Sequence, residues 1–201
     1  MLITGIKSKP VYAPLRADVG GRYHLMLASG PGAAAVLRVL AELQNSAPQA
    51  LGNTRLLMVP ENAQAAGPFR PLGLAELRVF GDSPALLAAF RQVLDESLMG
   101  TRLYVAGPES FIGLAMQIAL EFDLNKDEIR AEEMGTLARR VYCVHCRATA
   151  EDVRTNIVRC AGCERWLLVR DHYSRRLAAY MGVMADAEAP GELPALKEVY
   201  L

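Results

Sequence analysis

Residues 24–32 read His24-Leu25-Met26-Leu27-Ala28-Ser29-Gly30-Pro31-Gly32. The first five form a short apolar run without polar alternation, which is typical of a β-strand buried on both faces. The glycine-rich turn closes this strand, and apolar residues then recur at helical spacing. These residues are Ala33, Val36, Leu37, Leu40 and Leu43. The stretch therefore predicts a strand, a tight turn and a helix in succession.

The same alternation continues to about residue 134. Further strands are expected at 56–59, 77–80, 103–106 and, as an edge strand, 129–134. Further helices are expected after a cap at Asp82 or Ser83 and from about Ser110 to Phe122. Strands and helices that alternate at this pace predict an α/β fold with a doubly wound parallel sheet covered on both faces.

Composition narrows the class of protein. The 201 residues are 52% hydrophobic and 22% charged, so the chain has enough apolar material for a folded core. Twenty-two basic and 22 acidic residues give no net attraction to nucleic acid or to an anionic membrane. No apolar run approaches the ~20 residues that span a bilayer. Met1-Leu2-Ile3-Thr4-Gly5-Ile6 does not resemble a secretory signal, so we expect a cytoplasmic protein.

All four cysteines lie in two short motifs, Cys143-Val144-His145-Cys146 and Cys160-Ala161-Gly162-Cys163. Two residues between paired cysteines let one turn direct both sulfurs at the same ion, and two such turns complete a tetrahedral four-sulfur site. Without a secretory signal, this spacing indicates a metal rather than disulfides. The sequence therefore predicts a small C-terminal zinc ribbon with Cys143, Cys146, Cys160 and Cys163 as ligands.

The choice of metal lies between zinc and a rubredoxin-type iron, since four thiolates suit both. Iron-binding turns of that type usually have glycine after the second cysteine, whereas this chain has Arg147 and Glu164 there. We therefore favour zinc. Four sulfurs leave a zinc ion no open position, so the expected role is structural and not catalytic.

The region that contains the cysteines is basic, since residues 139–176 contain nine arginines and four acidic residues. A basic block, residues 170–176, follows the second cysteine pair in this region. We predict partner binding by part of this block, either to a carboxylate-rich surface or to a cofactor phosphate. The predicted residues are Arg170, His172, Tyr173, Arg175 and Arg176. Two alternatives stay open: a solvated charged edge, and a nucleic-acid-binding ribbon whose binding depends on salt.

These patterns divide the chain into three parts. Residues 1–138 are expected to form the α/β domain and residues 139–183 the zinc ribbon with its basic block. Residues 184–201 contain Pro190, Gly191 and Pro194 and end in apolar residues, which is typical of a tail that docks on a partner.

Two glycine-containing turns, Ser29-Gly30-Pro31-Gly32 and Gly107-Pro108-Glu109-Ser110, follow predicted strands at the edge where such sheets bind ligands. They make Gly30, Gly32, Gly107 and Pro108 candidates for binding a phosphate of NAD(P), and tight strand-to-helix turns without a ligand are the alternative.

The stretch Tyr104-Val105-Ala106-Gly107-Pro108-Glu109-Ser110-Phe111, residues 127–134 and the turn at 28–32 resemble the nicotinamide-binding domain of ferredoxin–NADP reductase relatives. Ala106 replaces that family's cysteine, Met134 replaces its closing aromatic residue, and its flavin-domain Arg-x-Tyr-Ser motif is absent. The departures favour a relic of the nucleotide domain that serves for docking.

Three further stretches stand out: residues 6–12, the two cysteine motifs, and Arg170-Asp171-His172-Tyr173-Ser174-Arg175-Arg176 with the residues that continue to Val183. Together they resemble the DmmA-like subunit of dimethylamine monooxygenase, and the resemblance covers nearly the whole chain. The resemblance implies a complex in which electrons pass from a pyridine nucleotide through a flavin and iron–sulfur reductase subunit to a haem subunit. Haem, FMN and a 2Fe–2S cluster are then expected in partner subunits only.

The implied function is that of a subunit without catalytic residues, which bridges the reductase and haem subunits of a haem-dependent monooxygenase for secondary amines. The alternative functions are a pyridine-nucleotide-binding electron-transfer component and the nucleic-acid-binding ribbon.

Overall fold

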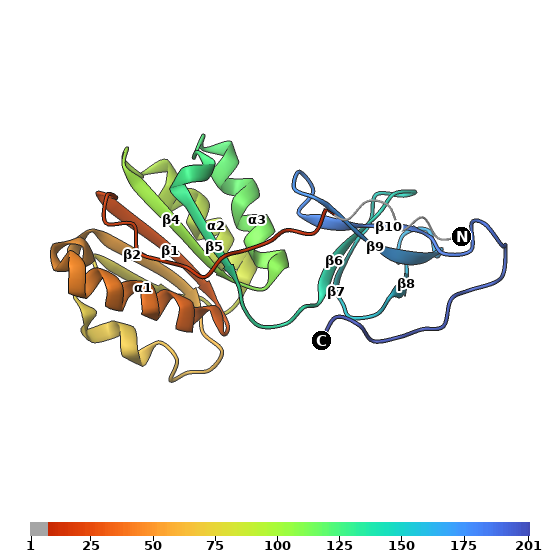
Figure 1. Ribbon diagram of the computed structural model, residues 1–201, viewed down its shortest axis with the longest axis horizontal. Coiled ribbons are helices and arrows are strands. Elements are labelled where there is room, and N and C mark those ends of the chain that lie inside the picture. The colour runs from red at the N-terminus through yellow and green to blue at the C-terminus, as the bar shows by residue number, and fades with distance from the viewer. Residues whose placement is uncertain (1–7) are drawn as a thin grey trace. The chain divides into compact units, whose positions relative to one another are not determined.

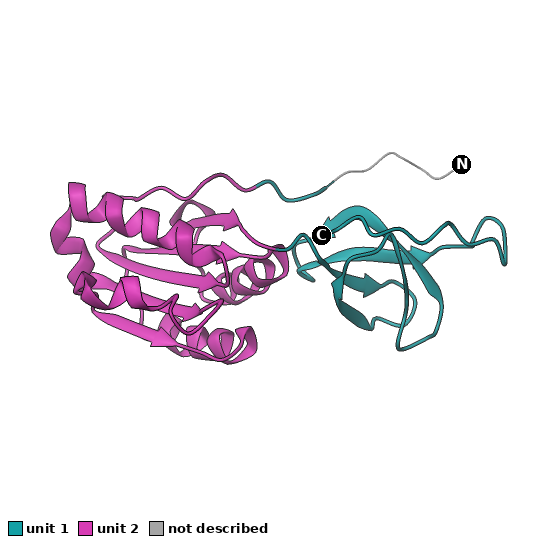
Figure 2. Ribbon diagram, turned by 90° about the horizontal axis from the view of Figure 1, so that it is seen from below, with its two compact units in different colours: residues 1–11, 136–201 teal, residues 12–135 magenta. Residues whose placement is uncertain are grey.

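A computed structural model describes residues 8–201, which form two compact units (Figure 2). The larger is the α/β unit, Tyr12–Gly135. The smaller, called the ribbon module below, combines residues 8–11 with Thr136–Leu201. Residues 1–7, on which the expectation of a cytoplasmic protein without a secretory signal rests, lie outside the described residues.

The segment before Tyr12 differs from its expected assignment to the α/β domain. The Ser8 backbone N–H donates to the Asp171 carbonyl oxygen at 3.0 Å, and the Tyr173 N–H donates to Ser8 Oγ at 3.0 Å. These bonds join residues more than 160 positions apart, which no local pattern in the sequence reveals.

The sheet of the α/β unit is fully parallel, with strand order β3-β2-β1-β4-β5. Its strands are β1 (Tyr23–Ser29), β2 (Thr54–Val59), β3 (Glu76–Val79), β4 (Thr101–Gly107) and β5 (Ile129–Glu133). This order reverses between β1 and β4, as in doubly wound nucleotide-binding folds. The predicted fold class is confirmed, with β5 at the edge of the sheet.

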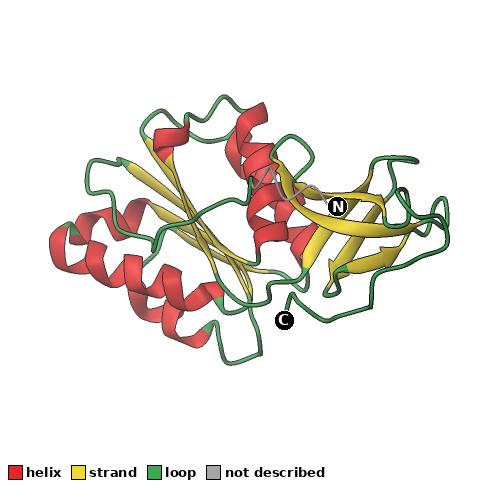
Figure 3. Ribbon diagram, turned by 45° about the vertical axis from the view of Figure 1, so that its right-hand side comes forward, coloured by secondary structure: helices red, strands yellow, loops and turns green. Residues whose placement is uncertain are grey.

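Helices cover both faces of this sheet (Figures 1 and 3). They are α1 (Gly32–Ser46), α2 (Ser83–Asp95) and α3 (Glu109–Glu121), with three 3-10 turns at Pro48–Asn53, Gly67–Leu72 and Lys126–Glu128. Met26 and Ala28 pack with α1, whereas Leu25 and Leu27 pack with α2 and α3. Side chains alternate between the faces of a strand, so an unbroken apolar run supplies both layers. Asp82 caps α2, since its Oδ1 accepts from the Ala85 N–H at 2.8 Å.

An extended segment, residues 12–18, completes the α1 face. Leu15 is buried in the core beside α1. Its N–H donates to Glu132 Oε2 at 2.6 Å, and the Ala17 N–H donates to Glu42 Oε2 at 2.9 Å. At its end, Asp18 accepts from Arg102 Nε at 2.9 Å. The segment is thus fastened along its length by acidic side chains of β5 and α1 and by Arg102 of β4.

The ribbon module is a second five-stranded sheet, with strand order β7-β6-β10-β9-β8. Its strands are β6 (Arg139–Cys143), β7 (Thr149–Val153), β8 (Ile157–Arg159), β9 (Trp166–Ser174) and β10 (Ala179–Met184). β6 and β10 are parallel, and all other pairs are antiparallel. Val141, Tyr173 and Tyr180 belong to its small core.

The chain end packs on the same module. The N–H groups of Val199 and Tyr200 donate to the Arg154 carbonyl oxygen at 2.9 and 3.0 Å, and Arg139 Nη1 donates to Tyr200 Oη at 2.9 Å. The sequence predicts that this tail docks on a partner, and in the structure Val199 and Tyr200 contact their own module. None of the helices in residues 8–201 has the length and apolar character to span a membrane.

Candidate functional site

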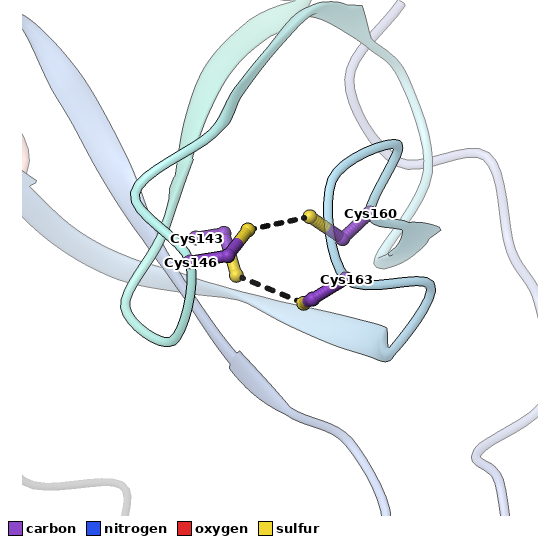
Figure 4. Close-up of side chains that lie close together, drawn as sticks. All are labelled: Cys143, Cys146, Cys160 and Cys163. Carbon is purple, nitrogen blue, oxygen red and sulfur yellow. Dashed lines mark hydrogen bonds between the residues drawn. The ribbon is translucent and has the colours of Figure 1, made fainter.

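The four cysteines lie in two turns of the ribbon module. Cys143 ends β6 and Cys146 lies in the turn to β7, while Cys160 and Cys163 lie in the turn from β8 to β9. Their four Sγ atoms are all within 4.8 Å of one another, with Cys146–Cys160 at 3.4 Å and Cys143–Cys163 at 3.7 Å (Figure 4). A tetrahedral zinc site with Zn–S bonds of ~2.3 Å has S–S edges of about 3.8 Å. The cluster therefore has the size that a single metal ion requires.

Backbone hydrogen bonds shape each turn. The Cys143 N–H donates to the Ala148 carbonyl oxygen, and the Arg147 N–H donates back to the Cys143 carbonyl oxygen. The second turn repeats the pattern with Cys160, Glu164 and Arg165. Arg147 and Glu164 each follow the second cysteine of a pair, the position where iron-binding turns usually have glycine. Their φ angles of 67° and 59° lie in the left-handed region, so the turns require this conformation there.

Gly162 is a residue of the site that the sequence analysis did not single out. A Cβ atom on this residue would lie 2.9 Å from Cys146 Sγ. Only glycine therefore lets the second turn approach the first so closely. The position of Gly162 between two paired cysteines was the feature of the sequence that could have identified it as part of the site.

Electrostatics favour a cation at the centre of the cluster. The Arg165 N–H donates to Cys163 Sγ and, with the Arg165 side chain, lowers the pKa of that thiol to about 6. The Ala148 N–H acts to lower the pKa of Cys146, but neighbouring sulfurs outweigh it and raise the pKa to about 12. Burial acts to raise the pKa of Cys160, yet the N–H groups of Cys163 and Gly162 lower it overall. Sulfurs this close share protons unless a cation neutralises them, and a divalent ion is the cation that thiolates bind.

The residues fit a four-coordinate metal held by sulfur. Cys143 and Cys160 are buried, Cys163 is half-buried and Cys146 is exposed. Four sulfurs fill a tetrahedral shell and leave no position for water or substrate. An ion bound by all four sulfurs would cross-link the β6–β7 turn to the β8–β9 turn.

The predicted nucleotide-binding residues meet at the carboxyl edge of the parallel sheet, but two of them are buried. A Cβ on Gly32 would lie 2.2 Å from the Ala106 carbonyl oxygen and 2.8 Å from the Gly107 N. Gly32 thus has a packing role, since it lets α1 approach the end of β4. Gly107 is buried against Ser29, whereas Gly30 and Pro108 are half-buried.

The chain itself covers this edge. The Met134 N–H donates to the Gly107 carbonyl oxygen at 2.9 Å, and a Cβ on Gly135 would lie 3.5 Å from Pro31 and 3.9 Å from Pro108. Glu109, which the sequence analysis did not select, is buried at the start of α3 and accepts from Tyr12 Oη at 3.3 Å. The N-terminus of α3 has the positive potential that would attract a phosphate, and the Glu109 carboxylate already occupies this position.

The basic block forms the hairpin of β9 and β10. His172, Arg175 and Arg176 are exposed and Arg170 is half-buried. Tyr173 is 6% exposed and its ring packs edge-on against Tyr180 at 5.1 Å, within the module core. Side chains alternate along β9 and this one points inward, so the burial of Tyr173 counts against its predicted contact with a partner.

Several arginines of the module have acidic partners. Ion pairs join Arg139 to Asp171 at 2.6 Å, Arg140 to Glu151 at 2.7 Å, Arg154 to Asp152 at 3.3 Å and Arg159 to Glu164 at 3.2 Å. These pairs engage all four acidic residues of 139–176, so the excess of five arginines in that region remains.

Comparison with known proteins places the chain in a family. Residues 4–129 match the model for the N-terminal domain of the dimethylamine monooxygenase subunit DmmA-like family, and residues 140–183 match the model for its C-terminal domain. The heme-dependent oxidative N-demethylase delta subunit of Ectopseudomonas mendocina (strain ymp) is 36% identical over 97 residues. That match covers 48% of this chain and 55% of the relative, so the chain spans about half the length of the curated relative that it matches.

Solved structures with a similar arrangement include a ferredoxin reductase and an FAD/NAD-binding domain. The ferredoxin reductase in carbazole 1,9a-dioxygenase is 15% identical, with a TM-score of 0.45 over 59% of this chain and 34% of that chain. The flavohem-like FAD/NAD-binding domain of nitric oxide dioxygenase from Vibrio cholerae is 17% identical, with a TM-score of 0.41 over 63% and 56%. These likenesses are limited, and the fold assignment rests on the sheet order itself. From the two family matches, which together extend over most of its length, the chain belongs to the dimethylamine monooxygenase subunit DmmA-like family.

Proposed function

We propose that this chain is a subunit without catalytic residues in a haem-dependent assembly that oxidatively demethylates secondary amines such as dimethylamine. Its family and the 36% identical relative, the delta subunit of a heme-dependent oxidative N-demethylase, support a subunit role. In this proposal the chain bridges the haem subunit and a flavin and iron–sulfur reductase subunit. Haem, FMN and the 2Fe–2S cluster then belong to those partners.

The observation that carries the proposal is the closed set of four sulfurs. Cys143, Cys146, Cys160 and Cys163 approach one another as ligands of one ion, and they leave it no open coordination position. We take this ion to be structural zinc. Its cross-link orders the hairpins of the ribbon module, and the module thereby assists electron transfer by holding the redox subunits together.

The β9–β10 hairpin is the proposed partner-binding surface. Arg140 Nη1 donates to the Leu177 carbonyl oxygen at 2.6 Å, and the Leu177 N–H donates to the Ser174 carbonyl oxygen at 3.1 Å. These bonds fix the turn that presents Arg175 and Arg176 to solvent. Two guanidinium groups on a turn whose backbone is held in place suit carboxylates on a partner surface.

The pyridine-nucleotide function is the weaker alternative. It requires a phosphate near Gly30, Gly32, Gly107 and Pro108, where Glu109 places a carboxylate and Met134 with Gly135 covers the edge. Titration of the isolated chain with NADPH decides between the two: micromolar binding that Gly30→Ala abolishes would support the alternative, and absent binding would remove it. The nucleic-acid alternative is weaker still, because the 22 basic and 22 acidic residues of the chain give no net attraction to nucleic acid.

The proposed function is tested by co-purification from cells that make the whole assembly. The native chain is expected to bring down haem- and flavin-containing proteins, with one zinc per chain by elemental analysis. Cys143→Ser and Cys160→Ser are expected to lose the zinc and the partners together. His145→Ala is the matched control, since this exposed residue lies in the same turn without belonging to the four-sulfur set. Zinc-free variants that still assemble and turn over normally would contradict the proposal, as would a red, iron-containing chain.

A further inference from the structure

A cavity of about 200 Å³ lies in the α/β unit at the amino ends of β1, β2 and β4. The last turn of α2 and the loop that follows this helix border it as well. Its walls are mostly apolar and include Tyr23, Leu25 and Val93. The carboxyl ends of the strands, which carry Gly30 and Gly107, lie at the opposite edge of the sheet, so this cavity is separate from the predicted nucleotide site.

The cavity results from the position at which α2 ends. Three leucines of β1, β2 and β4 belong to the layer that packs with α2 and α3; they are Leu25, Leu57 and Leu103. Side chains alternate along a strand, so the residues two positions earlier, Tyr23, Arg55 and Thr101, lie on the same face of the sheet. Because α2 ends at Asp95, the first residues of these strands border an open space beside the end of the helix.

The nearby side chains leave this space unfilled. Leu98 and Met99, the two large apolar residues of the loop after α2, are 60% and 96% exposed. A Cβ atom on Gly52, another wall residue, would meet nothing within 4 Å. Water is released when an apolar group enters a space with apolar walls, and this release favours binding. The cavity therefore suits the apolar part of a small molecule.

Arg55 gives this cavity a cationic group. Among the described residues that line the cavity, it is the only arginine or lysine. Its Nη1 lies 3.4 Å from Glu96 Oε2, and its Nε lies 3.9 Å from Glu76 Oε2. Ion pairs of this length at the surface contribute little free energy, and Glu96 is an exposed residue that can turn to solvent. The guanidinium can therefore exchange these contacts for two parallel hydrogen bonds to a carboxylate.

An adjoining cavity of about 380 Å³ extends from the first one along β3. It shares four wall residues with the first cavity, Arg55 among them, and its walls are mostly polar. Arg78 also lines it, and Arg78 Nε lies 3.9 Å from Glu76 Oε1. An apolar space and a polar space thus meet at Arg55, and a second arginine adds positive potential on the polar side.

We propose that this cavity binds a small organic acid, with the carboxylate on Arg55 and the apolar body beside Tyr23, Leu25 and Val93. An apolar protein cavity of ~150 Å³ holds a benzene molecule, so a volume of about 200 Å³ suits a body of about six to eight carbon atoms. The ligand class is therefore an aromatic or branched aliphatic monocarboxylate. All of these residues belong to the α/β unit, so binding of the acid does not depend on the function proposed for the ribbon module.

Isothermal titration calorimetry of the full, metal-containing chain with phenylacetate tests the proposal. One saturable site is expected at submillimolar concentrations, and Arg55→Met is expected to weaken binding at least tenfold. Glu96→Gln should bind phenylacetate at least twofold more tightly, because it removes a carboxylate that competes for Arg55. Arg91→Met is the matched control and should bind within twofold of the native chain, since Arg91 pairs with Glu121 and does not line either cavity.

Two measurements on the native chain keep the test independent of the folding of any variant. Phenylacetamide, the neutral analogue, should bind at least tenfold more weakly than phenylacetate. NMR of the isotope-labelled chain should show amide shifts on adding phenylacetate at residues 23–25, 52–55 and 93–101, and none at residues 30–32. Absence of saturable binding, shifts centred on residues 30–32, or tighter binding of benzylamine than of phenylacetate overturns the proposal. A folded Arg55→Met variant that binds like the native chain overturns it as well.

Discussion

Residues 12–135 bury two apolar layers, one on each face of a five-stranded sheet, whereas the ribbon module buries only two small clusters with a sheet of the same strand number. The α/β unit is therefore stabilised mainly by burial of apolar surface. The module needs cross-links: the four-sulfur centre at one end of β9 and Arg139, held between two tyrosine rings, nearer the other. Units of one chain thus depend on different interactions, and they should respond differently to the same perturbation.

Removal of the metal is expected to produce the largest difference between the units. Metal binding by small sulfur sites contributes on the order of 10 kcal/mol to folding. A strong chelator should therefore abolish hydrogen-exchange protection throughout β6–β10 and leave the protection of β1–β5 unchanged. Peptide-resolved exchange by mass spectrometry measures both units in one sample. Retained protection in the module after complete loss of metal would show that its small core suffices.

Substitution of Tyr173 is expected to rank second. The side chain is buried and packs against Tyr180, so Tyr173→Ala should cost about 3–4 kcal/mol of module stability. Arg175→Ala, two residues further along the hairpin and exposed, is the control and should change stability by less than about 0.5 kcal/mol. Urea denaturation monitored by hydrogen exchange in β9 and β10 measures the change in module stability for each variant. If the two variants changed the stability equally, Tyr173 would not be a core residue and would be available for partner binding.

The success of sequence reasoning also differs between the units. Strands β1, β2 and β4 could be located because each contains a short apolar run closed by glycine or proline, which are local signals. The four cysteines were found because metal ligands recur at fixed spacing. The burial of Tyr173 was not predicted because this residue stands among charged residues, and only the pairing of β9 with β10 shows which face it lies on.

Contacts between distant residues carried no such signal. The pairing of Ser8 with Tyr173 and of Arg139 with Tyr200 joins residues across the chain, and no periodicity marks them. Gly162 and Glu109 were visible as residue types, but their importance depends on how closely two turns or two segments approach.

Substitution of Gly32 is expected to give the reverse of the metal experiment. A Cβ 2.2 Å from the Ala106 carbonyl oxygen must push α1 away from β4, so Gly32→Ala should destabilise the α/β unit by about 2–3 kcal/mol. The module should keep its stability and its metal. Gly52→Ala is the matched control, because a Cβ there meets nothing within 4 Å. Exchange in β1 and β4 provides the measurement, and a wild-type value for Gly32→Ala would mean that α1 is less tightly held than the contact implies.

A mild fall in pH is expected to give the smallest effect and to act on the α/β unit through His24. Burial lowers the pKa of His24, with Asp18 partly opposing and Arg102 reinforcing the shift. The unfolded chain therefore binds a proton at a higher pH than the folded chain does. The contribution of His24 to stability is complete above its unfolded-state pKa of 6.5. It is lost as pH falls from there toward the pKa of His24 in the folded chain. The slope cannot exceed about 1.4 kcal/mol per pH unit for one group.

The other two histidines, His145 and His172, belong to the module, so His24 is the one imidazole of residues 12–135. Urea denaturation of the native chain, followed by exchange in β1 and β4 at pH 7.5 and pH 5.5, should show lower stability at the acidic value. His24→Gln cannot take up this proton, so its stability should change less between the two pH values. A slope that the substitution leaves intact would assign the pH dependence to carboxylates instead, such as Asp18 and Glu42, whose pKa values are lowered by their N–H and arginine partners. Because those carboxylates lose stability only at more acidic pH, the interval between 7.5 and 5.5 separates the two causes.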